Sequence, residues 1–204
     1  MFGADSGERQ ETMNTEDLGA SKVINWLVKP AGMMMGSRVR GWLMNPVRTL
    51  QGADVQPGET ALEVGCGTGF FTIPAAQLLG DEGHLVAMDP VSDFVHQVSR
   101  KVDAASLTNV EVVRRDALNT GLGDGSMDVA LLFGVIPWPA LPLNRLLPEM
   151  HRVLKPQGRM AVWLFPPLVH SWVHGAILRS GLFRYLGKHN GVHSYMRVLS
   201  STAH

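Results

Sequence analysis

The residues best suited to chemistry lie together in the stretch Glu63-Val64-Gly65-Cys66-Gly67-Thr68-Gly69. Its three glycines alternate, which lets the backbone turn sharply and approach a bound molecule with no Cβ in the way. Apolar residues alternate up to Val64 as in a buried strand, and the residues after Gly69 have the pattern of a helix. The free N–H groups at the start of that helix would face the turn, so the stretch favours a ligand held against bare backbone.

A second acid, Asp89, follows Gly69 by twenty residues and ends the run His84-Leu85-Val86-Ala87-Met88. In a strand–helix–strand unit, a carboxylate at this point can accept hydrogen bonds from both hydroxyls of a ribose. The glycine turn and Asp89 together predict a nucleoside-binding unit.

Strands and helices must alternate to position these residues. Five β–α alternations predict an α/β fold, a mostly parallel sheet with helices on both faces. Near the end of the chain, Asn190-Gly191 between apolar alternating runs predicts a hairpin that adds an antiparallel edge. The expected strands are 60–64, 85–88, 110–114, 128–133, 159–165, 183–186 and 192–199, and the expected helices are 70–79, 91–104, 143–154 (stopped by residues 155–158) and one from 168 to about 179.

A chain of 204 residues is long enough for one domain and a short extension. We expect a flexible tail over residues 1–19, a Trp- and Met-rich helical lid over 20–56 and the main domain over 57–204. Within the lid segment, Asn45 is expected to cap a helix whose first residue is Pro46.

The composition of the chain limits which classes of function and which cell compartments are expected. Eighteen basic residues balance eighteen acidic ones, which disfavours nucleic acid as a partner. Cys66 is the single cysteine and cannot form an internal disulfide, which favours a reducing compartment. No apolar signal segment is visible near the start, and the longest apolar run, 129–143, is too short and too broken by proline to span a bilayer. We therefore expect a cytoplasmic protein.

Four blocks occur in the order and at roughly the spacing of a known family: the glycine stretch, Asp89-Pro90, Arg115-Asp116-Ala117 and the run from Glu149 to Gly158. Over residues 45–199 the chain resembles class I S-adenosylmethionine-dependent methyltransferases of the methyltransferase type 11 and ubiquinone-biosynthesis-methyltransferase-like kind. The resemblance implies a Rossmann-like sheet of seven strands with a C-terminal antiparallel hairpin and an N-terminal helical lid. It also implies an enzyme that uses S-adenosylmethionine and releases S-adenosylhomocysteine.

The same resemblance assigns roles to single residues. Glu63 would help to hold the methionine ammonium group, Asp89 the ribose, and Asp116 the adenine amino group. The cofactor-binding residues it implies are Glu63, Gly65, Cys66, Gly67, Gly69, Asp89, Pro90, Asp116, Ala117, Phe133 and Gly134.

The sequence contains fewer features that identify the residues around the methyl acceptor. The apolar stretch 134–139 stands where many relatives carry a polar residue, and five tryptophans predict a small or amphiphilic acceptor with an apolar body. In-line methyl transfer depends mainly on alignment, and a base is needed only if the acceptor arrives protonated. The candidates for that base are His170, His193 and Tyr195, although most of the late histidines are expected to be surface or hairpin residues. His170 and His174 would share a helix face, but no third ligand has a matching spacing, so no metal is predicted.

Two interpretations of residues 22–44 remain open: a lid over the cofactor, which we favour, or a segment that contacts an anionic membrane. The alternatives for function are a membrane-surface phospholipid (amine) methyltransferase and a non-catalytic protein that binds S-adenosylmethionine. The oligomeric state and the acceptor atom are left open by the sequence.

Overall fold

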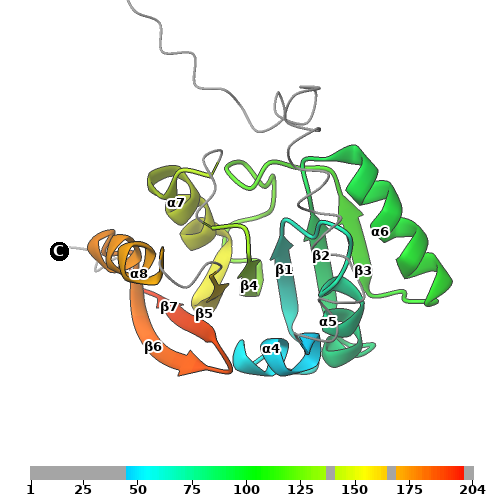
Figure 1. Cartoon of the computed structure of the whole chain (residues 1–204), viewed down its shortest axis with the longest axis horizontal. Coiled ribbons are helices and arrows are strands. Elements are labelled where there is room, and N and C mark those ends of the chain that lie inside the picture. Colours follow the sequence, from blue (N-terminus) through cyan, green and yellow to red (C-terminus); the bar gives the residue numbers. More distant parts are fainter. Residues whose placement is uncertain (1–44, 137–140, 165–168, 200–204) are drawn as a thin grey trace, which may run out of the picture.

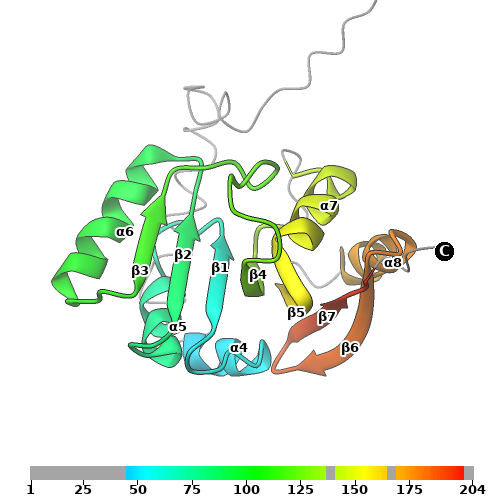
Figure 2. The same ribbon diagram turned by 180° about the vertical axis from the view of Figure 1, so that it is seen from behind.

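The computed structural model describes residues 45–136, 141–164 and 169–199. The predicted tail (1–19) and most of the predicted lid segment (20–56) lie outside these residues. The described chain forms one seven-stranded sheet in the order β3-β2-β1-β4-β5-β7-β6 (Figures 1 and 2). Its strands are β1 (Thr60–Val64), β2 (His84–Met88), β3 (Val110–Val113), β4 (Met127–Phe133), β5 (Leu154–Trp163), β6 (Phe183–His189) and β7 (Val192–Arg197).

The strands from β3 to β5 are mutually parallel, whereas β7 runs antiparallel to both of its neighbours. This confirms the predicted Rossmann-like, mostly parallel sheet with a C-terminal antiparallel hairpin. None of the helices in the described residues is long and apolar enough to cross a membrane.

Helices cover both faces of the sheet (Figures 1 and 2). Neighbouring residues on a strand point to opposite faces, so Ala61 and Leu62 belong to different halves of the core. The half that contains Ala61 is covered by α4 (Pro46–Gly52), α5 (Thr72–Leu79) and α6 (Ser92–Ala104), and the half that contains Leu62 by α7 (Leu143–Val153) and α8 (His170–Arg179).

Two local predictions are confirmed at the level of single hydrogen bonds and dihedral angles. Asn45 caps α4, because its side chain accepts from the backbone N–H of Arg48 at 3.2 Å, and Pro46 is the first helical residue. At the hairpin turn, Asn190 and Gly191 have φ angles of 48° and 84°. Positive φ at both central residues matches the twist of a two-residue hairpin.

Other boundaries differ from the predictions. Helix α5 begins at Thr72 rather than at residue 70, because residues 70 and 71 still belong to the glycine turn. Residues 155–158, expected to be a turn between a helix and a strand, lie inside β5. They form an irregularity there, since the pairing with β4 jumps from Leu154 to Arg159, and Gln157 takes a positive φ of 65°.

Candidate functional site

The predicted cofactor residues gather at the carboxyl ends of neighbouring strands. Strand β1 lies between β2 and β4, so the helices that follow β1 and β4 pack on opposite faces of the sheet. A crevice at such a switch point is where open α/β sheets bind ligands. Glu63 lies near the end of β1, Asp89 directly follows β2, and Gly134 directly follows β4.

The glycine turn is closely joined to the end of β2. The backbone N–H groups of Gly65 and Cys66 both donate to the carbonyl of Met88, at 2.8 and 3.0 Å. Gly65 has a φ of 68°, and a Cβ built on it would lie 2.4 Å from a methyl carbon of Val135. A side chain is therefore excluded at this position by both the backbone angle and the available space.

Gly67 differs from Gly65 in what surrounds it. It also has a positive φ, 52°, yet a Cβ there would meet no atom closer than the carbonyl oxygen of Gly65 at 4.0 Å. The backbone of Gly67 thus faces open space beside the two acids. The space and the acceptor groups around it fit the adenosyl and methionine parts of S-adenosylmethionine.

Asp89 is buried, with 6% of its surface exposed, and is already partly bonded. Its Oδ2 accepts from the N–H of Gly67 and its Oδ1 from the N–H of Val91, each at 2.9 Å. Burial raises the pKa of Asp89 to about 6, because it outweighs these two hydrogen bonds. Each carboxylate oxygen keeps one lone pair for a ribose hydroxyl, so Asp89 can both bind the ligand and hold the turn in place.

Glu63 is the second buried acid, with 3% of its surface exposed. Burial raises its pKa to about 8, and the neighbouring Asp89 adds to the rise, while a hydrogen bond from Thr72 opposes it. The hydroxyl of Thr72 donates to Oε2 of Glu63 at 2.6 Å. Sequence reasoning missed Thr72, although a hydroxyl residue just after the glycine turn was a visible signal.

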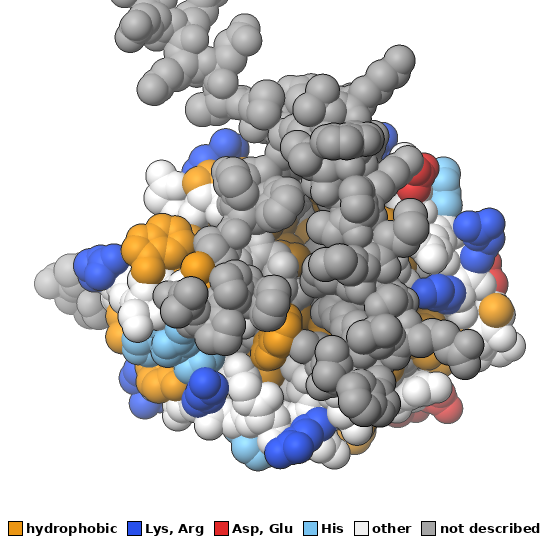
Figure 3. All heavy atoms as spheres, in the orientation of Figure 1, with side chains coloured by type: hydrophobic (Ala, Val, Ile, Leu, Met, Phe, Trp, Pro, Cys, Tyr) orange, Lys and Arg blue, Asp and Glu red, His pale blue; other side chains and the backbone are white. Residues whose placement is uncertain are grey.

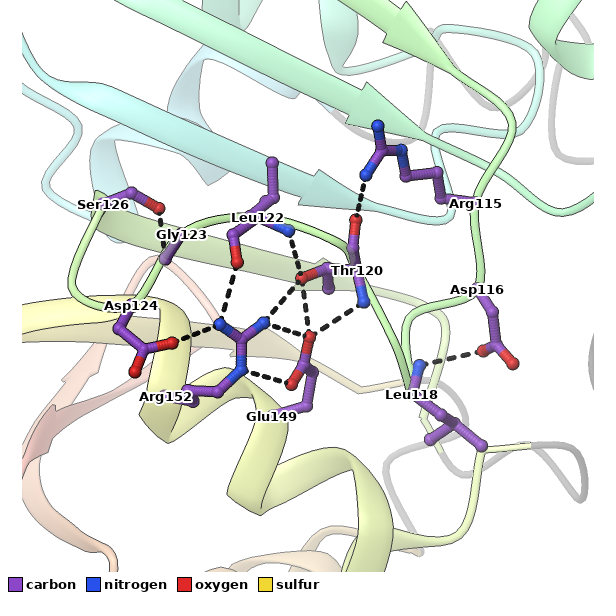
Figure 4. Close-up of polar contacts among 10 residues, drawn as sticks. All are labelled: Arg115, Asp116, Leu118, Thr120, Leu122, Gly123, Asp124, Ser126, Glu149 and Arg152. Carbon is purple, nitrogen blue, oxygen red and sulfur yellow. Dashed lines mark hydrogen bonds and ion pairs between the residues drawn. The ribbon is translucent and has the colours of Figure 1, made fainter.

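Asp116 lies in the loop between β3 and β4, with 7% of its surface exposed. Its Oδ1 accepts from the N–H of Leu118 at 2.8 Å, and its other oxygen points away from this contact (Figure 4). The loop places Asp116 and the buried Ala117 at the same edge of the sheet as Asp89. Their contact with adenine stays a prediction.

The motif that begins at Glu149 holds this loop (Figure 4). Glu149 accepts from the N–H and hydroxyl of Thr120 at 2.8 and 2.6 Å, and from Arg152 at 2.7 and 2.8 Å. Arg152 also donates to the carbonyl of Leu122 and to Asp124. Burial acts to raise the pKa of Glu149, but the hydrogen bonds from Arg152 and Thr120 outweigh it and hold the pKa at about 2. These two motif residues therefore support the loop that carries Asp116.

Three other residues implied by the resemblance make contacts within the protein mainly through packing or through their backbone. Cys66 is buried among apolar side chains, and burial raises the pKa of its thiol, which therefore stays protonated at pH 7. The ring of Phe133 packs edge-on against Phe71, with centroids 4.8 Å apart, in the half of the core covered by α4 and α5, and its contact with the cofactor stays a prediction. Pro90 offers its carbonyl, which accepts from Arg114 at 3.1 Å.

The acceptor-side candidates form a cluster where α8 packs on the hairpin. His193 lies in the hairpin, as expected, and both His193 and Tyr195 are buried, with 4% and 0% of their surfaces exposed. The reason is long-range, because α8 covers this face of β7. Nε2 of His170 lies 3.1 Å from Nδ1 of His193, and the hydroxyl of Tyr185 lies 3.1 Å from the same nitrogen. Nδ1 of His174 lies 2.9 Å from the hydroxyl of Tyr195.

Burial lowers the pKa of His193 to about 4, and it also lowers that of His170. The nearby His170, Lys188 and His174 add to the effect on His193. The imidazole of His193 is therefore neutral at pH 7. In the part of the chain that the structure describes, no group of three or more His, Cys, Asp or Glu residues is placed to hold a metal ion.

The two tryptophans that the structure describes lie in different surroundings. Trp163 packs with the α4 and α5 half of the core, whereas Trp172 is 58% exposed on the outer side of α8. The side chains of α8 that enter the core are Val173 and Ile177, which turns Trp172 away from the sheet. The other three, Trp26, Trp42 and Trp138, lie outside the described residues.

Comparison with known proteins agrees with this geometry. Residues 61–158 match the family model described as "Methyltransferase domain". The chain is 36% identical over 134 residues to a demethylmenaquinone methyltransferase of Listeria welshimeri, an alignment that covers 65% of this chain and 55% of that protein. It is 35% identical over 113 residues to a demethylmenaquinone methyltransferase of Bacillus cereus, covering 55% of this chain and 47% of the relative. The chain thus spans about half the length of these relatives.

The fold is also similar to that of a solved S-adenosylmethionine-dependent methyltransferase from Aquifex aeolicus. The two superpose with a TM-score of 0.68 at 23% identity, over 82% of this chain and 96% of that one. Fold, family model and glycine turn agree: residues 61–158 form a methyltransferase domain, and the comparisons support the class I S-adenosylmethionine-dependent methyltransferase that the motifs predicted. The cofactor of this class is S-adenosylmethionine, and S-adenosylhomocysteine is the product.

Proposed function

We propose that this chain transfers the methyl group of S-adenosylmethionine to a small, largely apolar, quinone-type acceptor by in-line displacement. The observation that supports it most is the open backbone of Gly67 between two buried acids at the switch point of the sheet. The acceptor class is supported by the name of the relatives, which are demethylmenaquinone methyltransferases, and by the apolar stretch 134–136 next to the glycine turn.

Our mechanism assigns three binding tasks. Asp89 would accept the ribose hydroxyls, Asp116 the adenine amino group, and Glu63 would face the positive charge of the methionine part. When bound, the cofactor supplies a methyl group made electrophilic by its sulfonium sulfur. Alignment of acceptor and methyl group can account for about 7–11 kcal/mol of the barrier, so the rigid turn at Gly65 and Gly67 is central to the proposal.

A quinol acceptor also needs to lose a hydroxyl proton, and we assign that task to the histidine cluster. Nδ1 of His193 has one lone pair, and in the arrangement that we assign, Nε2–H of His170 donates to it while the hydroxyl of Tyr185 lies beside it. Nδ1 of His170 is then the unprotonated nitrogen that can accept a proton. His193 and Tyr185 act as positioning residues in this scheme, and the buried Tyr195 holds His174 in the same way.

The cluster lies at the same edge of the sheet as the cofactor residues. Across the sheet, Glu63 pairs with Leu131, Leu131 with Ala161, and Ala161 with Ser194. Three strand spacings correspond to about 14 Å, and His193 is one residue nearer the carboxyl edge than Ser194. We place the acceptor at this edge, between the acids and the histidines.

The test is transfer of a labelled methyl group to a short-chain demethylated naphthoquinol, followed by mass spectrometry. We expect methylated quinol and S-adenosylhomocysteine in equal amounts, and a kcat for His170→Ala lower by about a hundredfold at pH 7. The decrease in kcat should be smaller at high pH, where the quinol loses its proton to the solvent without a base from the protein. His84→Ala, an exposed histidine on β2, is the matched control and should leave turnover unchanged. Transfer of the label to phosphatidylethanolamine, or to no acceptor, would contradict the proposed acceptor.

A further inference from the structure

The charges of this chain are divided unevenly along its length. After Glu149, the sequence to residue 204 contains no Asp or Glu but seven Lys and Arg residues. Three of these, Arg152, Lys155 and Arg159, form ion pairs with acids from earlier parts of the chain. Arg179, Arg184, Lys188 and Arg197 form no ion pair within the described residues. A chain of zero net charge therefore has one end with uncompensated positive charge.

The same end exposes most of the large apolar side chains. Among the described residues six such side chains are exposed, and only Val47 lies elsewhere. Trp172 is 58% exposed and Leu178 40% exposed on α8, and Leu186 is 45% exposed on β6. Val198 and Leu199 follow β7, whose last residues lie beside α8 at one end of the molecule (Figures 1 and 2).

Basic and apolar side chains are interleaved on these elements. Along the edge strand β6, Arg184, Leu186 and Lys188 are exposed. Arg184 pairs with Met196 and Lys188 with His193, across an irregularity between Tyr185 and Gly187, so the two basic side chains extend from opposite faces of this sheet edge. On α8, Arg179 follows Trp172 by seven residues, which places both on one side of the helix. On the face drawn in Figure 3, red acidic atoms occur toward the α6 and β3 end, and none is visible over α8 and the hairpin.

We propose that this end of the molecule docks on an anionic phospholipid bilayer. The docking surface consists of Trp172, Leu178, Arg179, Arg184, Leu186 and Lys188. Tryptophan and leucine enter the boundary between headgroups and acyl chains, while the long Lys and Arg side chains reach anionic headgroups from the same depth. A nucleic acid would use the positive charge and leave the exposed Trp and Leu side chains without a partner, so the combination favours lipid.

The surface differs from the segment 22–44 that the sequence suggested for membrane contact. Docking by itself needs neither cofactor nor acceptor. Docking would give a lipid-soluble acceptor access to the crevice, and this consequence for catalysis rests on the proposed function. The binding test below is therefore made without either molecule, so that failure of docking and failure of the proposed function give different results.

The experiment is flotation of the full chain with vesicles of phosphatidylcholine, with and without phosphatidylglycerol. We expect the protein to float only with the anionic vesicles. Each Lys or Arg near an anionic surface contributes about 1 kcal/mol, so the triple variant R179E/R184E/K188E should bind about a hundredfold more weakly, or worse. Trp172→Ala should weaken binding as well, even at low salt.

Arg100→Glu is the matched control, because Arg100 is exposed on α6, away from the docking surface. It should float like the wild type, whereas Arg184→Glu should bind measurably more weakly. All of these positions are exposed, so thermal unfolding should confirm intact folding. Turnover of a soluble short-chain quinol should be retained by R179E/R184E, which leaves Lys188 beside the histidine cluster unchanged. The proposal is overturned if the wild type ignores anionic vesicles, if the triple variant floats unchanged, or if the protein binds RNA or DNA and not vesicles.

Discussion

The raised pKa of Glu63 predicts that cofactor binding depends on pH in a defined range. The pKa rises from 4.5 to about 8 because the carboxyl group is buried beside Asp89. At pH 7 the side chain is therefore only about one-tenth ionised in the free protein. If the ionised form faces the positive methionine group, affinity at pH 7 is about tenfold below its limit at high pH, or about 1.4 kcal/mol.

Calorimetric titration with S-adenosylhomocysteine between pH 7 and pH 9 measures this effect. In this range Asp89, with a pKa of about 6, is already largely ionised. We expect affinity to rise toward pH 8 and then level off, with close to one proton released at pH 7. In Glu63→Gln, which is neutral and of the same shape, the affinity should be weaker above pH 8 and independent of pH. Wild-type binding that is flat over this range, with no proton released, would refute the reasoning.

The same pKa shift makes a prediction about folding. An acid whose pKa is higher in the folded protein stabilises the fold at low pH, and that contribution is lost as pH rises from 4.5 through about 8. The unfolding free energy of the wild type should therefore fall over this range by a few kcal/mol, about 5 at most. Glu63→Gln should lack this fall, which denaturant titrations at a series of pH values would detect.

Three further predictions concern the supporting contacts. Thr72→Val removes a hydrogen bond that lowers the pKa of Glu63, so the pH dependence of cofactor affinity should move to higher pH; an unchanged profile would exclude this contact as its cause. Gly65→Ala brings a methyl group against Val135 and should cost about 1–3 kcal/mol of stability in denaturant titrations, along with cofactor affinity. Because the pKa of Glu149 is lowered, its ionised side chain stabilises the fold above pH 4.5, and this contribution is lost as pH falls through about 2. Glu149→Gln should therefore be less stable than the wild type at pH 7, and its stability should change less with acid.

Features with local causes could be predicted from the sequence. The Asn45-Pro46 helix start and the Asn190-Gly191 turn are determined by side-chain capping and by backbone angles within a few residues. The positions of Glu63 and Asp89 at the sheet edge follow from strand ends that local hydrophobic patterns mark well.

Features with long-range causes could not be predicted from the sequence. Residues 155–158 lie within the bounds of β5 as an irregularity, because Leu154 before them and Arg159 after them both pair with β4, a partner that no local pattern identifies. The burial of His193 and Tyr195 depends on α8 returning over the hairpin, and their contacts join residues more than twenty positions apart. The role of Arg152 in holding the loop near Asp116 likewise becomes visible only when α7 and that loop are seen together (Figure 4).

The measurement that tests the account most directly is binding of S-adenosylhomocysteine to the wild type and to Asp89→Asn. The account predicts one site per chain, with affinity reduced about tenfold or more in the variant, since hydrogen bonds to a charged acceptor contribute about 1.5–3 kcal/mol each. The Asn side chain retains an oxygen for a backbone N–H, so the variant should remain folded by circular dichroism. Absence of binding by the wild type, or equal affinity of the two proteins, would contradict the assignment of this edge of the sheet as the cofactor site.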